Sequence, residues 1–184
     1  MAVPKNIEVL TTIPFPDAVM QKLRSITPRI KINLHPAKQV DEIPEEIWKK
    51  IEVLYTDVLL PSPELVPNLK WVQLHYAGID FIQESPLLNK PDLIFSSMSG
   101  ASAIQEAEYI LTMLLAMGRN LPGLMERQRK QEWPKDRWEK FTPKELNGST
   151  VGLVGYGSIN REVARMLQAF NVTVLAAKKN VMQP

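Results

Sequence analysis

The sequence has no cysteine among its 184 residues, which excludes disulfide bonds, thiolate metal ligands and cysteine nucleophiles. It has only two histidines, so imidazole chemistry is confined to His35 and His75. No uninterrupted apolar run reaches the ~20 residues that a membrane-spanning helix needs. The N-terminus also lacks the basic and apolar regions of a secretory signal, so we expect a soluble cytoplasmic protein.

An excess of charge of one sign is missing as well. The formal net charge of +2 argues against a nucleic-acid binder or a membrane-surface protein. Basic and aromatic residues do interleave at positions 125–141, but acidic residues dilute the charge there. We expect a solvated helix and loop anchored by tryptophans rather than a nucleic-acid site. Neither nucleic acid, membrane nor metal ion is therefore expected as a partner.

With 45% hydrophobic residues, the chain can build the core of one domain or slightly more. Five β-rich runs stand in its first hundred residues, at 7–13, 30–35, 53–60, 71–76 and 93–97. Helical segments are expected between them, at 19–26, 43–51, 61–69 and 79–88. Such alternation predicts an α/β fold with a doubly wound parallel sheet and helices on both faces. Five strands in this length fit a flavodoxin-like domain over residues 1–100.

A long helix is predicted over residues 101–119, within a connecting segment at 101–122. Its apolar residues extend around much of the cylinder, which is typical of a helix buried on more than one side. We expect it to cover an apolar face of the first sheet. It would do so by folding back within the chain or by crossing to a second copy in a homodimer. A helix and loop linker is expected to follow over residues 123–147.

The sequence over residues 151–179 predicts a strand, a glycine turn, a helix and a second strand. This is the opening of a dinucleotide-binding βαβ unit. Gly155 permits the tight turn, and Gly157 lets the backbone approach a pyrophosphate. The N-terminus of the helix then holds the pyrophosphate with its N–H groups and dipole. A turn of this kind that binds nothing is the alternative interpretation.

Two positions depart from the dinucleotide-binding pattern. Asn160 stands where a third glycine lets helix and strand pack closely, and overpacking costs about 1–3 kcal/mol. Lys178 stands near the position of the acidic residue that bonds the ribose 2′-hydroxyl. A lysine there could instead meet a 2′-phosphate, so the choice between NAD and NADP stays open.

A series of motifs across nearly the whole chain resembles the D-isomer-specific 2-hydroxyacid dehydrogenases. These motifs are WVQ at 71–73, AGID at 77–80, AEY at 107–109, GRNLP at 118–122, ELNG at 145–148 and VGLVGYGSINREVAR at 151–165. The resemblance implies a flavodoxin-like substrate domain and a Rossmann domain. It also implies hydride transfer between NAD(P)H and a 2-oxo or D-2-hydroxy acid.

By this resemblance, the loop formed by Tyr76, Ala77 and Gly78 offers backbone N–H groups to a substrate carboxylate. An ordinary turn between strand and helix is the alternative. The resemblance also assigns the cofactor to one group of residues: Gly155, Tyr156, Gly157, Ser158, Ile159 and Lys178.

The family's catalytic arginine, carboxylate and histidine come from later segments that are not expected in this sequence, so no catalytic residue is assigned. His75 lies beside the carboxylate loop, but the sequence identifies no group that would orient it.

These expectations favour a truncated relative of the NAD(P)-dependent D-2-hydroxyacid dehydrogenases. It would have no catalytic activity on its own and would end in a partial Rossmann unit over residues 148–184. Two alternatives stay open. The chain could be half of a dehydrogenase that another chain completes, or it could be a module that binds small 2-oxo or 2-hydroxy acids or a protein partner. Whether it is an enzyme is left undecided.

Overall fold

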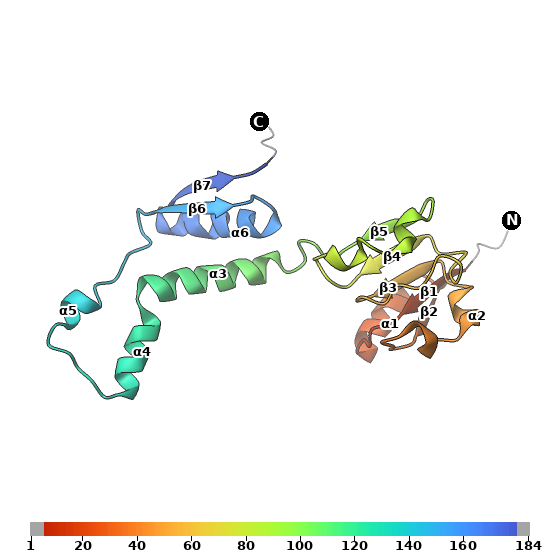
Figure 1. The fold of residues 1–184 in the computed structure, drawn as a ribbon, viewed down its shortest axis with the longest axis horizontal. Helices are drawn as coiled ribbons and strands as arrows, with labels where there is room; N and C mark the ends of the chain where they lie inside the picture. Colours follow the sequence, from red (N-terminus) through yellow and green to blue (C-terminus); the bar gives the residue numbers. More distant parts are fainter. Residues whose placement is uncertain (1–5, 180–184) are drawn as a thin grey trace. The chain divides into compact units, whose positions relative to one another are not determined.

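The chain folds into two compact units, Met1–Ser99 and Gly100–Pro184. The computed structural model describes residues 6–179. Each unit contains its own parallel sheet and its own cluster of buried apolar side chains (Figure 1). No helix in the described range is long and apolar enough to cross a membrane.

The first unit is built on a five-stranded parallel sheet with the order β2-β1-β3-β4-β5. Its strands are β1 (Ile7–Thr11), β2 (Ile30–Leu34), β3 (Val53–Thr56), β4 (Trp71–Leu74) and β5 (Ile94–Ser96). This order is that of the flavodoxin-like class, so the predicted parallel five-stranded fold is confirmed. Each strand lies within its predicted run and is shorter than that run.

One face of this sheet carries the main core. The register aligns Leu10 with Leu54 and Leu54 with Val72, and all three side chains are fully buried. Trp48 from α2 (Glu45–Trp48) belongs to the same buried cluster, and its indole N–H donates to the carbonyl oxygen of Val40 at 3.1 Å. The core face is therefore both apolar and free of an unpaired indole donor.

The opposite face is less covered toward β5. The register aligns Val9, Val53, Trp71 and Ile94 across it. The two valines are partly buried, whereas Trp71 and Ile94 are exposed. Helix α1 (Asp17–Ser25) packs near β2. The predicted helical cover on both faces is thus incomplete among the described residues.

Two predicted helices between strands are absent or broken. Residues 61–69 form turns rather than a helix, because prolines at 61, 63 and 67 remove N–H donors and disfavour helical geometry before them. The helix expected over 79–88 is two short 3₁₀ turns, η2 (Asp80–Ile82) and η3 (Pro86–Asn89). Another 3₁₀ turn, η1 (Val40–Glu42), precedes α2.

The second unit contains four helices and two strands in its described part. In chain order they are α3 (Ala103–Gly118), α4 (Leu121–Arg129), α5 (Arg137–Lys140), β6 (Thr150–Val154), α6 (Ser158–Leu167) and β7 (Thr173–Ala177), with the 3₁₀ turn η4 (Gln168–Phe170) after α6. Strands β6 and β7 pair in parallel, from Thr150 opposite Thr173 to Val154 opposite Ala177. The predicted strand, turn, helix and strand are all present.

Helix α3 packs on α6, as Figure 1 shows. Ala107 of α3 is fully buried in one cluster with Leu153 of β6 and with Val163 and Leu167 of α6. We expected this helix to cover the first sheet, and the contact that the structure establishes for it is with α6 of its own unit. The reason is that the βαβ unit also needs cover, since two strands seldom stand alone.

We predict that Ala107→Leu destabilises the second unit by about 1–3 kcal/mol, because the added carbons have no space between α3 and α6. Segment-resolved hydrogen exchange should show faster exchange in β6 and α6 with β3 unchanged. Glu108→Leu, at the neighbouring exposed position, is the matched control and should have little effect. Equal loss of protection in the strands of both units would contradict the assignment of α3 to the second unit.

Candidate functional site

The glycine turn follows directly from the end of β6. Gly155 has φ +83°, a conformation that glycine adopts without strain. Its N–H donates to the carbonyl oxygen of Ala177 at 2.8 Å, which ties the turn to the end of β7. Gly157 is the N-cap of α6 and has extended geometry. The turn therefore delivers the chain into α6 at the carboxyl edge of the two strands.

The N-terminus of α6 presents unused hydrogen-bond donors. The N–H of Arg161 donates to the carbonyl oxygen of Gly157 at 3.0 Å. No hydrogen bond found among residues 6–179 uses the N–H of Ser158 or Ile159. A Cβ placed on Gly157 would meet no atom within 4 Å. This backbone is accessible, and with the positive end of the helix dipole it can bind an anion.

The side chains of this turn have different tasks. Tyr156 and Ile159 are partly buried, and their side chains pack against the core of the second unit. Lys178 is exposed and directly follows Ala177, whose carbonyl accepts the N–H of Gly155. This hydrogen bond brings the backbone preceding the lysine next to the glycine turn.

Asn160 does not crowd the turn, so the expected overpacking is wrong. Its side-chain amide donates to the carbonyl oxygens of Val154 at 3.1 Å and of Gly155 at 2.9 Å. These carbonyl groups lie where the chain leaves β6, and the amide satisfies both of them. The residue that departs from the glycine pattern thus fixes the turn by hydrogen bonds.

The loop formed by Tyr76, Ala77 and Gly78 lies at the carboxyl end of β4, and all three residues are exposed. The carbonyl oxygen of Tyr76 accepts the N–H of Met98 at 3.1 Å, which anchors the start of the loop. In the described part of the chain, no hydrogen bond uses the N–H of Ala77 or Gly78. The loop can therefore offer backbone donors to a small anion.

A hydrogen bond beside this loop was missed by sequence reasoning. The Tyr55 hydroxyl of β3 lies 2.8 Å from Nδ1 of His75, and the two groups are hydrogen bonded. Burial raises the pKa of Tyr55, so its phenol keeps its proton at neutral pH. Both residues stand near the carboxyl ends of neighbouring parallel strands, and that shared edge was the available signal.

The same edge of the sheet holds a buried polar group. Burial raises the pKa of Asp57, but hydrogen bonds from the N–H of Val58 at 2.7 Å and the Lys38 ammonium at 3.2 Å outweigh it, so the net pKa is lowered. The Asp57 side chain is only 13% exposed. It stays ionised at neutral pH, and its charge is paired with the Lys38 ammonium.

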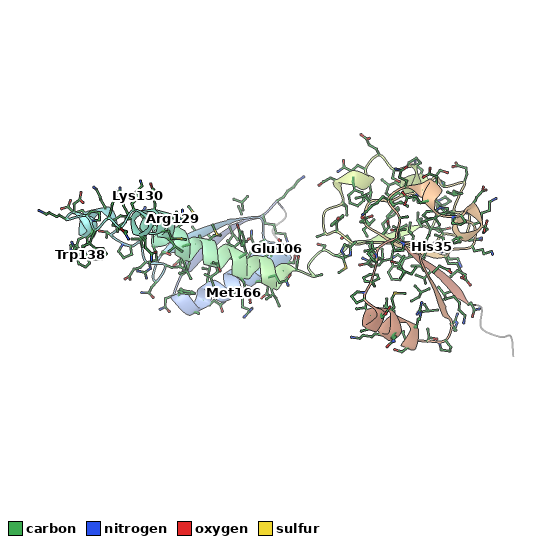
Figure 2. All side chains as sticks on the ribbon, turned by 90° about the horizontal axis from the view of Figure 1, so that it is seen from below. His35, Glu106, Arg129, Lys130, Trp138 and Met166 are labelled. Atoms are coloured by element: carbon green, nitrogen blue, oxygen red, sulfur yellow. The ribbon has the colours of Figure 1, made fainter. Side chains whose placement is uncertain are left out.

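Neither histidine belongs to an acid–base pair with a carboxylate within residues 6–179. Figure 2 marks His35 in the first unit. The backbone N–H of His35 donates to the carbonyl oxygen of Thr11 at 2.9 Å. The described side chains also include no group of three or more histidines, aspartates or glutamates that could hold a metal ion. The chemical groups that the described part of these two loops offers are backbone N–H donors.

Comparison with known families agrees with this geometry. Residues 111–183 match the family model described as D-isomer specific 2-hydroxyacid dehydrogenase, NAD binding domain. The chain is 34% identical to the erythronate-4-phosphate dehydrogenase of Pseudoalteromonas translucida, over 68% of this chain and 29% of that protein. It is 29% identical to the glyoxylate reductase of Thermofilum pendens, over 95% of this chain and 52% of that protein.

The chain is related to the D-isomer-specific 2-hydroxyacid dehydrogenases. It spans about a third to a half of the length of these two dehydrogenase relatives. By family resemblance, the cofactor is NAD or NADP.

Solved structures of the dehydrogenase fold are also similar. The D-lactate dehydrogenase from Aquifex aeolicus, complexed with NAD and lactic acid, superposes with a TM-score of 0.69 and 22% identity, over 96% of this chain and 52% of that one. An acyclic imino acid reductase complexed with NADPH and D-Arg superposes with a TM-score of 0.73 and 19% identity, over 97% of this chain and 58% of that one. At these identities the likeness shows the fold.

We predict that Asn160→Gly, which restores the dehydrogenase glycine pattern, lowers the stability of the second unit by about 1–2 kcal/mol. Two hydrogen bonds to carbonyl groups are lost, and glycine is a poor helix residue. Asn160→Ala loses the same bonds but keeps helix propensity, so it should be less harmful. Urea unfolding compares the three proteins, and a gain in stability for the glycine variant would contradict a hydrogen-bonding role for Asn160.

Proposed function

We propose that this chain binds NAD or NADP through the turn that leads into α6. The observation that carries the proposal is the accessible backbone of Gly157 together with the unused N–H groups of Ser158 and Ile159. These residues form the N-terminus of α6, where N–H donors and the helix dipole can stabilise a pyrophosphate. The bound cofactor supplies hydride chemistry. The chain's own residues hold its phosphates.

We further propose that the loop of Tyr76, Ala77 and Gly78 binds the carboxylate of a 2-oxo or 2-hydroxy acid. The unused N–H groups of Ala77 and Gly78 support this, because two neighbouring backbone donors can both hydrogen bond to a carboxylate. The loop lies at the carboxyl edge of a parallel sheet, where ligands bind in folds of this class.

The described residues alone are proposed not to catalyse hydride transfer. Among residues 6–179, neither histidine is paired with a carboxylate that would stabilise a protonated imidazole during proton transfer. The sheet of β6 and β7 also suits further strands. Val154 is 92% exposed and Leu175 is exposed as well, and among residues 6–179 each of the two strands has only one neighbour. An apolar face and open edges of this kind favour completion by additional strands, from this or another polypeptide.

The cofactor proposal predicts saturable binding of NADH or NADPH, followed by nucleotide fluorescence. Gly157→Val should weaken the binding at least about tenfold, because the side chain occupies the space that a phosphate needs. Gly152→Val is the matched control, since a Cβ at Gly152 also meets no atom within 4 Å but stands in β6, away from the turn.

The same titration tests Lys178. If its ammonium meets a 2′-phosphate, NADPH binds more tightly than NADH, and Lys178→Ala removes the difference. Equal binding of NADH by the wild type, the Gly157 variant and the Gly152 variant would mean that the turn holds no pyrophosphate.

A second copy of this chain is the proposed partner of α3. Tyr109, Met113 and Met117 follow one another at spacings of four residues and are exposed, Met117 by 72%. Such a stripe is typical of a helix that packs on another element. Because α6 covers a different side of α3, around Ala107, the stripe is still available.

We predict that light scattering gives the mass of a dimer for the wild type and of a monomer for Met117→Arg. An arginine in the stripe would bury an unpaired charge. Glu108→Arg, off the stripe on the same helix, is the control and should remain dimeric. A monomeric wild type would refute the homodimer.

A further inference from the structure

His75 is the best-positioned polar side chain beside the carboxylate loop. The backbone N–H of His75 donates to the carbonyl oxygen of Thr56 at 2.7 Å, so the backbone is fixed against β3. Its ring nitrogen Nδ1 is hydrogen bonded to the Tyr55 hydroxyl at 2.8 Å. Ala77 and Gly78, with their unused N–H groups, follow two and three residues later. Sequence reasoning found nothing that orients this imidazole, and Tyr55 does so.

The hydrogen bond favours one position for the proton on the ring, because the protonated Tyr55 hydroxyl can donate to Nδ1. The Tyr55 phenol is protonated at neutral pH, and among residues 6–179 its hydroxyl has no other hydrogen-bond partner than Nδ1. A neutral imidazole that accepts at Nδ1 carries its proton on Nε2. In the described part of the chain, Nε2 has no partner, and His75 is exposed. One N–H donor is therefore available to a ligand.

Aromatic neighbours restrict the motion of this ring. His75 contacts Tyr55 edge-on with ring centroids 5.8 Å apart, and it contacts Tyr76 in the same way at 5.7 Å. Phe15 packs on Tyr55 at 5.1 Å and extends the row. Such contacts stabilise one ring orientation, so the Nε2 donor is preorganised.

We propose that His75 is a ligand-binding residue that donates its Nε2 proton to the carboxylate of a small 2-oxo or 2-hydroxy acid, beside the N–H groups of Ala77 and Gly78. Tyr55 is its positioning residue. The inference rests on the proposed carboxylate site and adds its side-chain donor. A neutral side-chain donor in addition to two backbone N–H groups suits a compact carboxylate.

Nuclear magnetic resonance can test the donor directly, because the chain has only two histidines. Long-range proton–nitrogen correlation spectra of the full chain should show His75 in the Nε2–H form. Tyr55→Phe should shift His75 toward a mixture of both tautomers and leave His35 unchanged. A predominant Nδ1–H form of His75 in the wild type would overturn the inference.

Titration with pyruvate, with and without NADH, measures the effect on binding. His75→Asn places an amide near the Nδ1 position only and should weaken binding about tenfold or more. His75→Gln extends an amide donor toward the Nε2 position and should bind within about threefold of the wild type. Tyr55→Phe should weaken binding severalfold, and His35→Asn is the matched control.

The outcomes separate the two proposals. If the wild type binds pyruvate and all His75 and Tyr55 variants bind it equally, the inference fails and the carboxylate loop stands. If the wild type shows no saturable binding with or without NADH, the carboxylate site itself fails. Weaker pyruvate binding in His75→Asn, with affinity restored in His75→Gln, supports the donor role. If the histidine were only structural, an amide placed at the Nε2 position would not restore binding.

Discussion

Close packing of α3 on α6 at Ala107 is the contact on which the second unit depends. A two-stranded parallel sheet buries too little apolar surface to persist alone. Helix α6 covers one side of β6 and β7 through Val163 and Leu167, and α3 closes the core from beyond α6. A side chain as small as that of alanine lets two helices approach closely. The glycine turn is held in place because its flanking strand and helix are fixed by this core.

Backbone N–H groups are the common chemical element of both candidate sites. At the start of α6, helix geometry leaves Ser158 and Ile159 without intrahelical partners. After β4, the chain leaves the sheet, and the N–H groups of Ala77 and Gly78 lose their ladder partners. Both places leave backbone donors available to an anion, which is the basis of the two proposed sites. The match to an NAD-binding family agrees with the first of them.

Departures from the family pattern have physical consequences that differ in kind. Where the family pattern has a glycine that lets helix and strand pack closely, Asn160 makes two hydrogen bonds to carbonyl groups at the end of β6. These hydrogen bonds hold the turn in place. Lys178 places a positive charge just after β7, where the dinucleotide-binding pattern has an acidic residue. The first change concerns stability, and the second bears on the proposed choice between NAD and NADP.

The sequence by itself determined the strands, the long helix and the glycine turn. Alternating β-rich runs, helical spacing and glycine positions are local signals, and they predicted the parallel five-stranded sheet and the βαβ unit. The same local signals predicted a helical segment over residues 61–69, but this proline-rich stretch forms turns.

Tertiary structure alone decided the partner of α3, the hydrogen bonds of Asn160 and the pairing of Tyr55 with His75. The physical reason is that these contacts depend on which elements lie side by side. Twenty residues separate Tyr55 from His75 in the chain, and only the parallel pairing of β3 with β4 brings their polar groups to within 2.8 Å.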